Sequence, residues 1–260
     1  MTPEPASLIP QPVAAREPLW VPRNEFSDEF DGMRLDLQKW DSGVASWGRW
    51  SWEPENAWTE KGCLKLGIQY KEHVRDGKKL FYTSGIIRSK APPICYGYFE
   101  ARLKTAPLYP GVSPAFWLYR NEPNIWTEID FELSQGSNIR EIQANTFVFR
   151  HPAFPDQPIA SNPRISEVHP WQAPGDTRSD FHIYGLEWNA QELKWHVDGN
   201  LIRTRENTFW HQALDLVVSL GLRNPYATKP SPTGFPTAFE VDYVRTWKSS
   251  CNWQGAVLLY

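Results

Sequence analysis

Residues 195–202 read Trp-His-Val-Asp-Gly-Asn-Leu-Ile, and this stretch indicates that the chain forms antiparallel β-strands. Two short runs of aromatic, β-branched and other apolar residues flank Asp198-Gly199, a dipeptide that tolerates the positive φ angles of a tight two-residue turn. The stretch therefore predicts a β-hairpin with antiparallel strands at Leu193–Val197 and Leu201–Arg205.

Runs of the same type recur on both sides of this hairpin, each ended by Gly, Pro, Asn or Asp. They predict further strands at Cys63–Tyr70, Leu80–Ser89, Gly97–Thr105, Val112–Tyr119, Thr127–Leu133, Gln143–Phe149, His182–Trp188, Leu214–Leu222 and Ala238–Trp247. Only Asn207–Ala213 hints at a short helix. Many short strands with turns roughly every eight to twelve residues predict an all-β sandwich of two antiparallel sheets.

The two ends of the chain differ from the rest. Residues 1–23 contain prolines 3, 5, 10, 12, 18 and 22, which predict an extended tail rather than a packed element. They lack the charged and apolar regions of a signal peptide. No composition shift interrupts the rest, so we expect one domain at 24–250 and a short tail at 251–260.

Composition excludes several classes of function. A chain that is 41% hydrophobic, with 14 tryptophans, can build a large core and is not disordered. A net charge of −3 supplies no basic field for nucleic acid. No apolar run approaches the ~20 residues that cross a bilayer. Neither the histidines nor the cysteines have the spacing of a zinc or other transition-metal site.

The most informative chemistry lies in Trp126-Thr-Glu-Ile-Asp-Phe-Glu-Leu133. Side chains alternate in a strand, so Glu128, Asp130 and Glu132 share one face while the apolar residues between them share the other. Three like charges in a row destabilise a sheet. A solvated edge strand is one interpretation, but the aromatic residues nearby favour a strand inside a sheet, with acids kept for catalysis.

Two of these acids have the reach that a glycosidase needs. At ~3.3 Å per residue, the Cα atoms of Glu128 and Glu132 lie roughly 13 Å apart. Two long side chains leaning together can narrow this to the ~5–5.5 Å between the carboxyl groups of a retaining enzyme, whereas an inverting pair needs roughly 6.5–9.5 Å. Asp130, between them, can separate the proton affinities of the two glutamates.

Glu128–Glu132 resembles the catalytic motif of glycoside hydrolase family 16. Further matches, in the order of that family, span roughly residues 24–248: Phe26–Gly32, Gly97–Arg102, Pro114–Leu118, His182–Trp188, Trp195–Gly199 and Phe239–Arg245. The resemblance implies a concanavalin-like β-jelly roll with a concave sugar-binding cleft. It also implies endo-hydrolysis of a β-linked polysaccharide with retention, with Glu128 as nucleophile, Glu132 as acid/base and Asp130 as helper.

Tyr82–Gly85, Gly97–Arg102 and Leu108–Tyr119 are most similar to the κ-carrageenase and furcellaranase branch of that family, which implies cleavage of β-1,4 bonds in sulfated red-algal galactans. Guanidinium groups suit sulfate esters and indole faces suit sugar rings. We therefore expect substrate contacts from arginines and tryptophans, namely Arg49, Trp50, Trp117, Arg120, Trp126 and Arg223. Trp188, Trp195 and Trp247 are assigned to the core.

Two features depart from that branch. The acidic motif lacks the extra residue of a β-bulge and has the regular spacing of lichenases and xyloglucan enzymes. The next predicted strand has Asn145 where a histidine often supports the acid/base, and Asn145 is expected to replace it by hydrogen bonding. These departures leave retention intact but keep a β-agarase, porphyranase or β-glucanase activity as alternatives. Transglycosylation and a non-catalytic lectin-like binder on the same fold are separate alternatives that also stay open.

The resemblance also implies a structural Ca²⁺ on the convex side, held by Asp242, Glu29 and the carbonyl of Gly62, whereas catalysis needs no cofactor. Carboxylate and carbonyl oxygens are the ligands that calcium prefers. We expect a monomer whose partner is the polysaccharide, and not nucleic acid or a membrane. Because a polymer is too large to import, we expect a secreted or periplasmic protein whose signal peptide has been removed.

Overall fold

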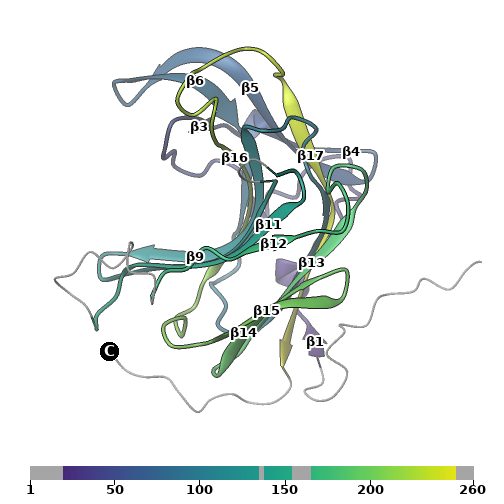
Figure 1. Cartoon of the computed structure of the whole chain (residues 1–260), viewed down its shortest axis with the longest axis vertical. Coiled ribbons are helices and arrows are strands. Elements are labelled where there is room, and N and C mark those ends of the chain that lie inside the picture. Colours follow the sequence, from purple (N-terminus) through teal and green to yellow (C-terminus); the bar gives the residue numbers. More distant parts are fainter. Residues whose placement is uncertain (1–19, 135–137, 154–164, 250–260) are drawn as a thin grey trace, which may run out of the picture.

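The computed structural model describes residues 20–134, 138–153 and 165–249, which form two packed β-sheets (Figure 1). The larger sheet has ten strands: β1 (Trp20–Pro22), β3 (Ser51–Trp52), β4 (Ala57–Glu60), β5 (Cys63–Arg75), β6 (Lys78–Ser84), β8 (Gly97–Lys104), β13 (His182–Trp188), β14 (Glu192–Val197), β15 (Asn200–Glu206) and β17 (Thr237–Ser249). The smaller has seven: β2 (Trp40–Asp41), β7 (Ile86–Ser89), β9 (Val112–Glu122), β10 (Ile125–Leu133), β11 (Glu141–Arg150), β12 (Pro170–Gln172) and β16 (Asp215–Leu222). Two 3-10 turns, η1 (Asn24–Phe26) and η2 (Pro54–Asn56), complete the described elements.

The sheet order confirms the antiparallel sandwich. The ten-stranded sheet runs β15-β14-β13-β8-β17-β5-β6-β3, with β1 on β17 and β4 on β5, and the seven-stranded sheet runs β12-β11-β10-β9-β16-β7-β2. The short β3 pairs with β6 in parallel, an exception to the antiparallel pattern. Figure 1 shows β9 and β16 bending along their length, so that the seven-stranded sheet is concave on the side away from the other sheet.

The core lies between the sheets and follows from the alternation of side chains. On β10, Ile129, Phe131 and Leu133 are at most 1% exposed and point inward, which leaves the acids for the concave face. Phe131 packs edge-on against Tyr184 of the facing sheet, with ring centroids 5.5 Å apart. The hairpin prediction is confirmed, because Asp198 and Gly199 connect β14 to β15 with φ angles of 49° and 78°.

The predicted strand Leu80–Ser89 is wrong as a single element, because Gly85 divides it. β6 belongs to the ten-stranded sheet and β7 to the seven-stranded sheet. The Gly85 amide donates to the carbonyl of Gly67, and its own carbonyl accepts from Leu220. The backbone at Gly85 thus bonds to strands of both sheets as the chain changes layer, which a continuous apolar run in the sequence does not indicate.

Three further expectations are corrected. The helix at 207–213 does not form, because the Asn207 side chain accepts from the Trp210 amide and donates to backbone carbonyls, which closes a loop instead. The tail predicted for residues 1–23 is too long, since Trp20–Pro22 pairs with β17. Trp247 is only half-buried and packs against Tyr98 on the outer face, whereas Trp188 and Trp195 are fully buried. Residues 1–19 and 251–260 lie outside the described residues.

Candidate active site

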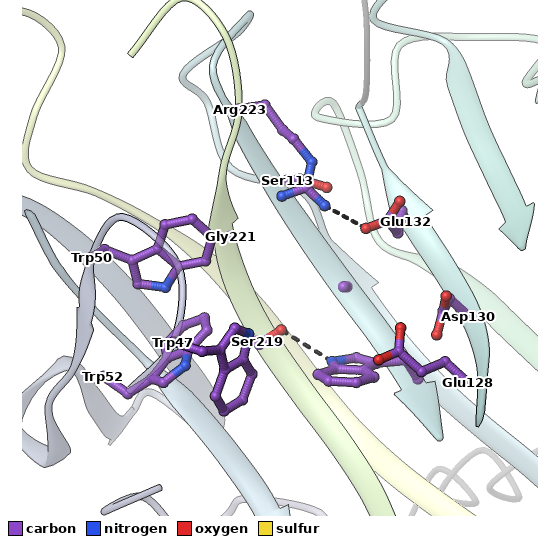
Figure 2. A pocket seen from close by; sticks show the side chains of 12 residues that line it. Trp47, Trp50, Trp52, Ser113, Glu128, Asp130, Glu132, Ser219, Gly221 and Arg223 are labelled. Atoms are coloured by element: carbon purple, nitrogen blue, oxygen red, sulfur yellow. Dashed lines mark hydrogen bonds and ion pairs between the residues drawn. The ribbon is translucent and has the colours of Figure 1, made fainter. Parts of the chain in front are cut away.

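The acids lie on a strand in the interior of the concave sheet. β10 is paired with β9 on one side and β11 on the other, and its register is continuous from Thr127 to Leu133. No bulge therefore separates the three acids, and all three project from the same face (Figure 2). The regular alternation of the three acids that the sequence predicted is therefore also present in the sheet.

This face forms one wall of a pocket. Figure 2 shows Glu128, Asp130 and Glu132 on one side and a group of tryptophans on the other. The lining residues are Trp47, Trp50, Trp52, Ser113, Ala115, Trp117, Glu128, Asp130, Glu132, Ser219, Gly221 and Arg223. The arrangement can hold a sugar ring between aromatic faces and carboxyl groups.

Each acid has a different set of hydrogen-bond partners. The indole nitrogen of Trp126 donates to Glu128 Oε1 over 2.8 Å. Glu132 accepts on both oxygens: the Arg223 guanidinium pairs with Oε1, and the Asn145 amide donates to Oε2 over 3.0 Å. Asp130 is 5% exposed, and within the described part of the chain its Oδ1 accepts no hydrogen bond.

Burial and repulsion raise the pKa values of two of these acids. Burial, together with the charge of Glu132, raises the pKa of Glu128 to about 7, although the Trp126 hydrogen bond opposes the shift. Burial and the charges of both glutamates raise the pKa of Asp130 well above its ordinary value, against the opposing charge of Arg223. Groups that titrate near neutrality in a cleft are typical of general acid–base and nucleophilic catalysis.

The backbone of β10 is held from the facing layer. Trp195, on β14, donates its indole N–H to the carbonyl of Asp130 over 3.2 Å. Trp210, in the loop that follows β15, donates to the carbonyl of Glu128 over 2.9 Å. Both indoles are fully buried, so two large core side chains fix the strand at the residues that carry the acids.

The structure brings only some of the predicted substrate residues together. Trp50, Trp117 and Arg223 line the pocket. Trp126 and Asn145 contact the acids without lining it. Arg49 and Arg120 are outside it: Arg49 donates to the carbonyl of Ala227 over 2.6 Å, and Arg120 pairs with Glu122 and Asp215.

Two pocket tryptophans were missed in the sequence. Trp47 is 41% exposed and packs edge-on against Trp52 and Trp117, at 5.2 and 6.4 Å between ring centroids. The signal was present as three tryptophans within residues 47–52. It could not show that this segment, anchored through β3 to the ten-stranded sheet, reaches the cleft of the other sheet.

The residues expected for calcium do not fit that ion. Asp242 pairs with Arg102 at 2.6 Å, and Glu29 forms a bidentate pair with Arg245 at 2.8 and 2.9 Å. Each carboxylate is therefore satisfied by an arginine, which would repel a cation. Gly62 lies in the turn between β4 and β5. In residues 20–134, 138–153 and 165–249, no group of three or more His, Cys, Asp or Glu side chains could hold a metal.

The described residues also contain no helix that is long and apolar enough to cross a membrane.

Comparison with known proteins gives one consistent group of relatives. The family profile described as "Beta-porphyranase A-D, GH16 domain" matches residues 20–249. The κ-carrageenase of Pseudoalteromonas carrageenovora is 36% identical over 274 aligned residues, which cover 93% of this chain and 68% of that protein. β-Porphyranase E of Zobellia galactanivorans is 31% identical and covers 69% of this chain and 67% of its own length.

Solved structures agree with the sequence relatives. The P. carrageenovora κ-carrageenase in complex with an oligotetrasaccharide of κ-carrageenan superimposes with a TM-score of 0.82 at 35% identity, covering 92% of this chain and 98% of that one. A κ-carrageenase from Z. galactanivorans gives a TM-score of 0.80 at 28% identity, covering 92% and 100%. Together with the acids in the cleft, these matches place the chain in glycoside hydrolase family 16, as a glycosidase of the κ-carrageenase-like branch.

Proposed function

We propose that this glycosidase cleaves β-1,4 bonds within sulfated red-algal galactans of the κ-carrageenan or furcellaran class, by endo attack and with retention. The observation that carries the proposal is the row of acids facing tryptophans across a pocket that also contains Arg223. The similarity to κ-carrageenases, one of them solved with a κ-carrageenan oligosaccharide, supports the same substrate class.

The reaction follows from two glutamates that flank one sugar–sugar bond. In the first step the Glu128 carboxylate attacks the anomeric carbon, the bond to the leaving oxygen breaks, and Glu132 gives its proton to that oxygen. A glycosyl ester on Glu128 results. In the second step Glu132 takes a proton from a water molecule, whose oxygen attacks the same carbon and releases Glu128. Two inversions leave the anomeric configuration unchanged.

Asp130 assists the nucleophile Glu128 in this scheme. The pKa of Asp130 is raised well above the ordinary value by burial and by the two glutamates, which favours its protonated form. A protonated carboxyl group is a hydrogen-bond donor, and Asp130 lies between the glutamates on the same face of β10. It can therefore stabilise the ionised form of Glu128, whose own pKa of about 7 is high for a nucleophile.

Substrate recognition is divided between aromatic rings and one cation. Trp47, which is well exposed, and Trp117 offer faces for galactose rings. Arg223 is the only lysine or arginine among the described residues that line the pocket, so it is the group that can take a sulfate ester there. We expect Arg49 and Arg120 to have no part in this. Because the proposed substrate is a polymer too large to import, we expect the protein to act outside the cell or in the periplasm.

A degradation panel tests the proposal. Purified protein is incubated with κ-carrageenan, furcellaran, porphyran, agarose, laminarin and lichenan, and reducing ends and product sizes are measured. We expect internal cleavage of κ-carrageenan or furcellaran, with a rapid fall in polymer size. Porphyran is the second candidate, because the matching family profile is that of β-porphyranases. Release of reducing ends from laminarin or lichenan alone would overturn the galactan assignment.

The variant Glu128→Gln separates an enzyme from a binder. It removes the nucleophile while keeping the size and hydrogen-bonding capacity of the side chain. We expect κ-carrageenan hydrolysis to fall by at least about 10³-fold, while retardation of the protein in gels containing κ-carrageenan is retained. If the wild-type protein and the variant bound the polymer equally and neither released reducing ends, the protein would be a lectin.

A further inference from the structure

Glu132 is held by two donors that reach it from different parts of the fold. Asn145, on the neighbouring strand β11, donates to Oε2 over 3.0 Å. Arg223, in the segment directly after β16, pairs with Oε1 from across the pocket (Figure 2). In this arrangement both carboxylate oxygens accept hydrogen bonds. Each carboxylate oxygen of Glu132, the assigned acid/base, is thus occupied by a hydrogen-bond donor.

This arrangement conflicts with the first step of the reaction. A guanidinium has donors only, so an oxygen in contact with it must accept and cannot carry a proton toward it. A cation at contact distance also favours the ionised form of a carboxyl group. In the pocket without substrate, Glu132 Oε1 is therefore an acceptor for Arg223, whereas cleavage requires Glu132 to give a proton to the leaving oxygen.

The remaining surroundings of Glu132 favour the opposite state. Its own strand supplies Glu128, which as a carboxylate repels a second negative charge, with Asp130 between the two glutamates. β11 contributes Gln143 and Asn145, and β9 contributes Ala115 opposite, all of them uncharged. Arg223 is thus the single positively charged side chain among the described residues that line the pocket, and it pairs with Glu132. If its guanidinium moved to another anion, the ionised Glu128 would favour protonation of Glu132.

The Arg223 side chain is 39% exposed, so an anionic group entering the pocket can reach it. Sulfate competes well for a guanidinium, because its oxygens match the donor fork of arginine. We propose that Arg223 is a substrate-released latch: a sulfate ester of the bound galactan draws the guanidinium from Glu132, which then takes up from solvent the proton that it delivers to the leaving oxygen. The inference rests on the proposed sulfated substrate.

The latch makes sulfate act on the chemical step. A simple anchor would hold sulfated substrate more tightly and change KM, whereas a latch changes the fraction of bound enzyme that carries an acid and so changes kcat. We compare κ-carrageenan with the same polymer after chemical desulfation. For the wild-type enzyme kcat should be at least about tenfold higher on the sulfated polymer. In Arg223→Gln the kcat ratio should approach one, and Arg223→Lys should restore part of it.

Arg120→Gln is the matched control. Arg120 is also an ion-paired arginine of the concave sheet, but it lies outside the pocket, so the wild-type kcat ratio should persist. A wild-type difference confined to KM, or a kcat ratio that survives in Arg223→Gln, would overturn the latch.

A measurement without turnover separates this inference from the proposed function. Proteins labelled with ¹³C at glutamate carboxyl groups are titrated by NMR, and the Glu132 signal is assigned through Glu132→Gln. Its titration midpoint should move to higher pH by roughly one unit or more when Arg223 is changed to Gln, and in the same direction when inorganic sulfate is added to the wild type. A midpoint that neither change moves would refute the latch, even in an enzyme that degrades κ-carrageenan. Inactivity toward sulfated galactans would refute the proposed function, whatever the titration shows.

Discussion

Glu128 and Asp130 are maintained at a cost to the stability of the fold. Both are carboxyl groups in a row of three acids on the concave face, where Asp130 is buried, and neither forms an ion pair in the described structure. Because folding raises the pKa of Glu128 from its ordinary value of 4.5 to about 7, the native state binds its proton more tightly than the unfolded state. This contribution to stability is complete below pH 4.5 and is lost as the pH rises through 7.

Neutralising these acids should therefore stabilise the protein, and more so at alkaline pH. We expect Glu128→Gln and Asp130→Asn each to gain about 1–3 kcal/mol of unfolding free energy at pH 8, with little gain at pH 4.5 for Glu128→Gln. Thermal denaturation at both pH values measures this, at roughly 2–4 °C per kcal/mol. Glu122→Gln, an exposed carboxylate of the same sheet, should change stability by less than about 0.5 kcal/mol. A loss of stability in both active-site variants at pH 8 would contradict this view of the site.

At the scale of single residues, the sequence predicted which face of a strand a side chain occupies better than it predicted which groups that side chain contacts. Strand alternation is sufficient to place Glu128, Asp130 and Glu132 on one face, because pleating leaves them no alternative. It could not distinguish Arg223, which reaches the pocket, from Arg49 and Arg120, which bind elsewhere. Arg49 and Arg120 lie directly beside aromatic residues in the sequence and Arg223 lies three residues before Tyr226, and the partners of all three come from distant segments or from strand ends.

At the scale of elements, the wrongly predicted strand Leu80–Ser89 shows that a local sequence pattern does not indicate to which sheet a strand belongs. His182–Trp188 was predicted with the observed bounds, because turn residues limit it on both sides. Leu80–Ser89 was predicted as one strand, because its apolar character continues through Gly85. Only the packing of the two sheets shows that the chain changes layer there, as the hydrogen bonds of Gly85 to Gly67 and Leu220 record.

Gly85 should therefore tolerate no side chain. A Cβ atom added there would lie 2.1 Å from the backbone oxygen of Asn56, which cannot move without displacing η2. We expect Gly85→Ala to lose more than about 3 kcal/mol of stability or to be recovered unfolded. Gly175→Ala is the control, since nothing lies within 4 Å of its added Cβ atom. Equal melting temperatures for the two variants, measured by circular dichroism, would show that the backbone at Gly85 has room for a Cβ atom and would contradict this prediction.

The cleft itself is a property of the whole molecule. Its acids come from the centre of the seven-stranded sheet, whereas Trp47, Trp50 and Trp52 come from a segment attached to the edge of the ten-stranded sheet. The indoles of Trp195 and Trp210, which lie outside the seven-stranded sheet, hold the backbone of β10 at the acids. The sandwich class was predictable from strand patterns alone, but contributions from distant segments to one pocket depend on how the sheets pack and curve.

The assembled molecule is proposed to work by double displacement between Glu128 and Glu132, and the configuration of the first product tests this most directly. Proton NMR spectra are recorded within minutes of adding the enzyme to κ-carrageenan, before the new reducing ends mutarotate. The account predicts that the β-anomer appears first and the α-anomer only later, at the rate of mutarotation. First appearance of the α-anomer would mean a single displacement by water and would contradict the assignment of Glu128 as nucleophile.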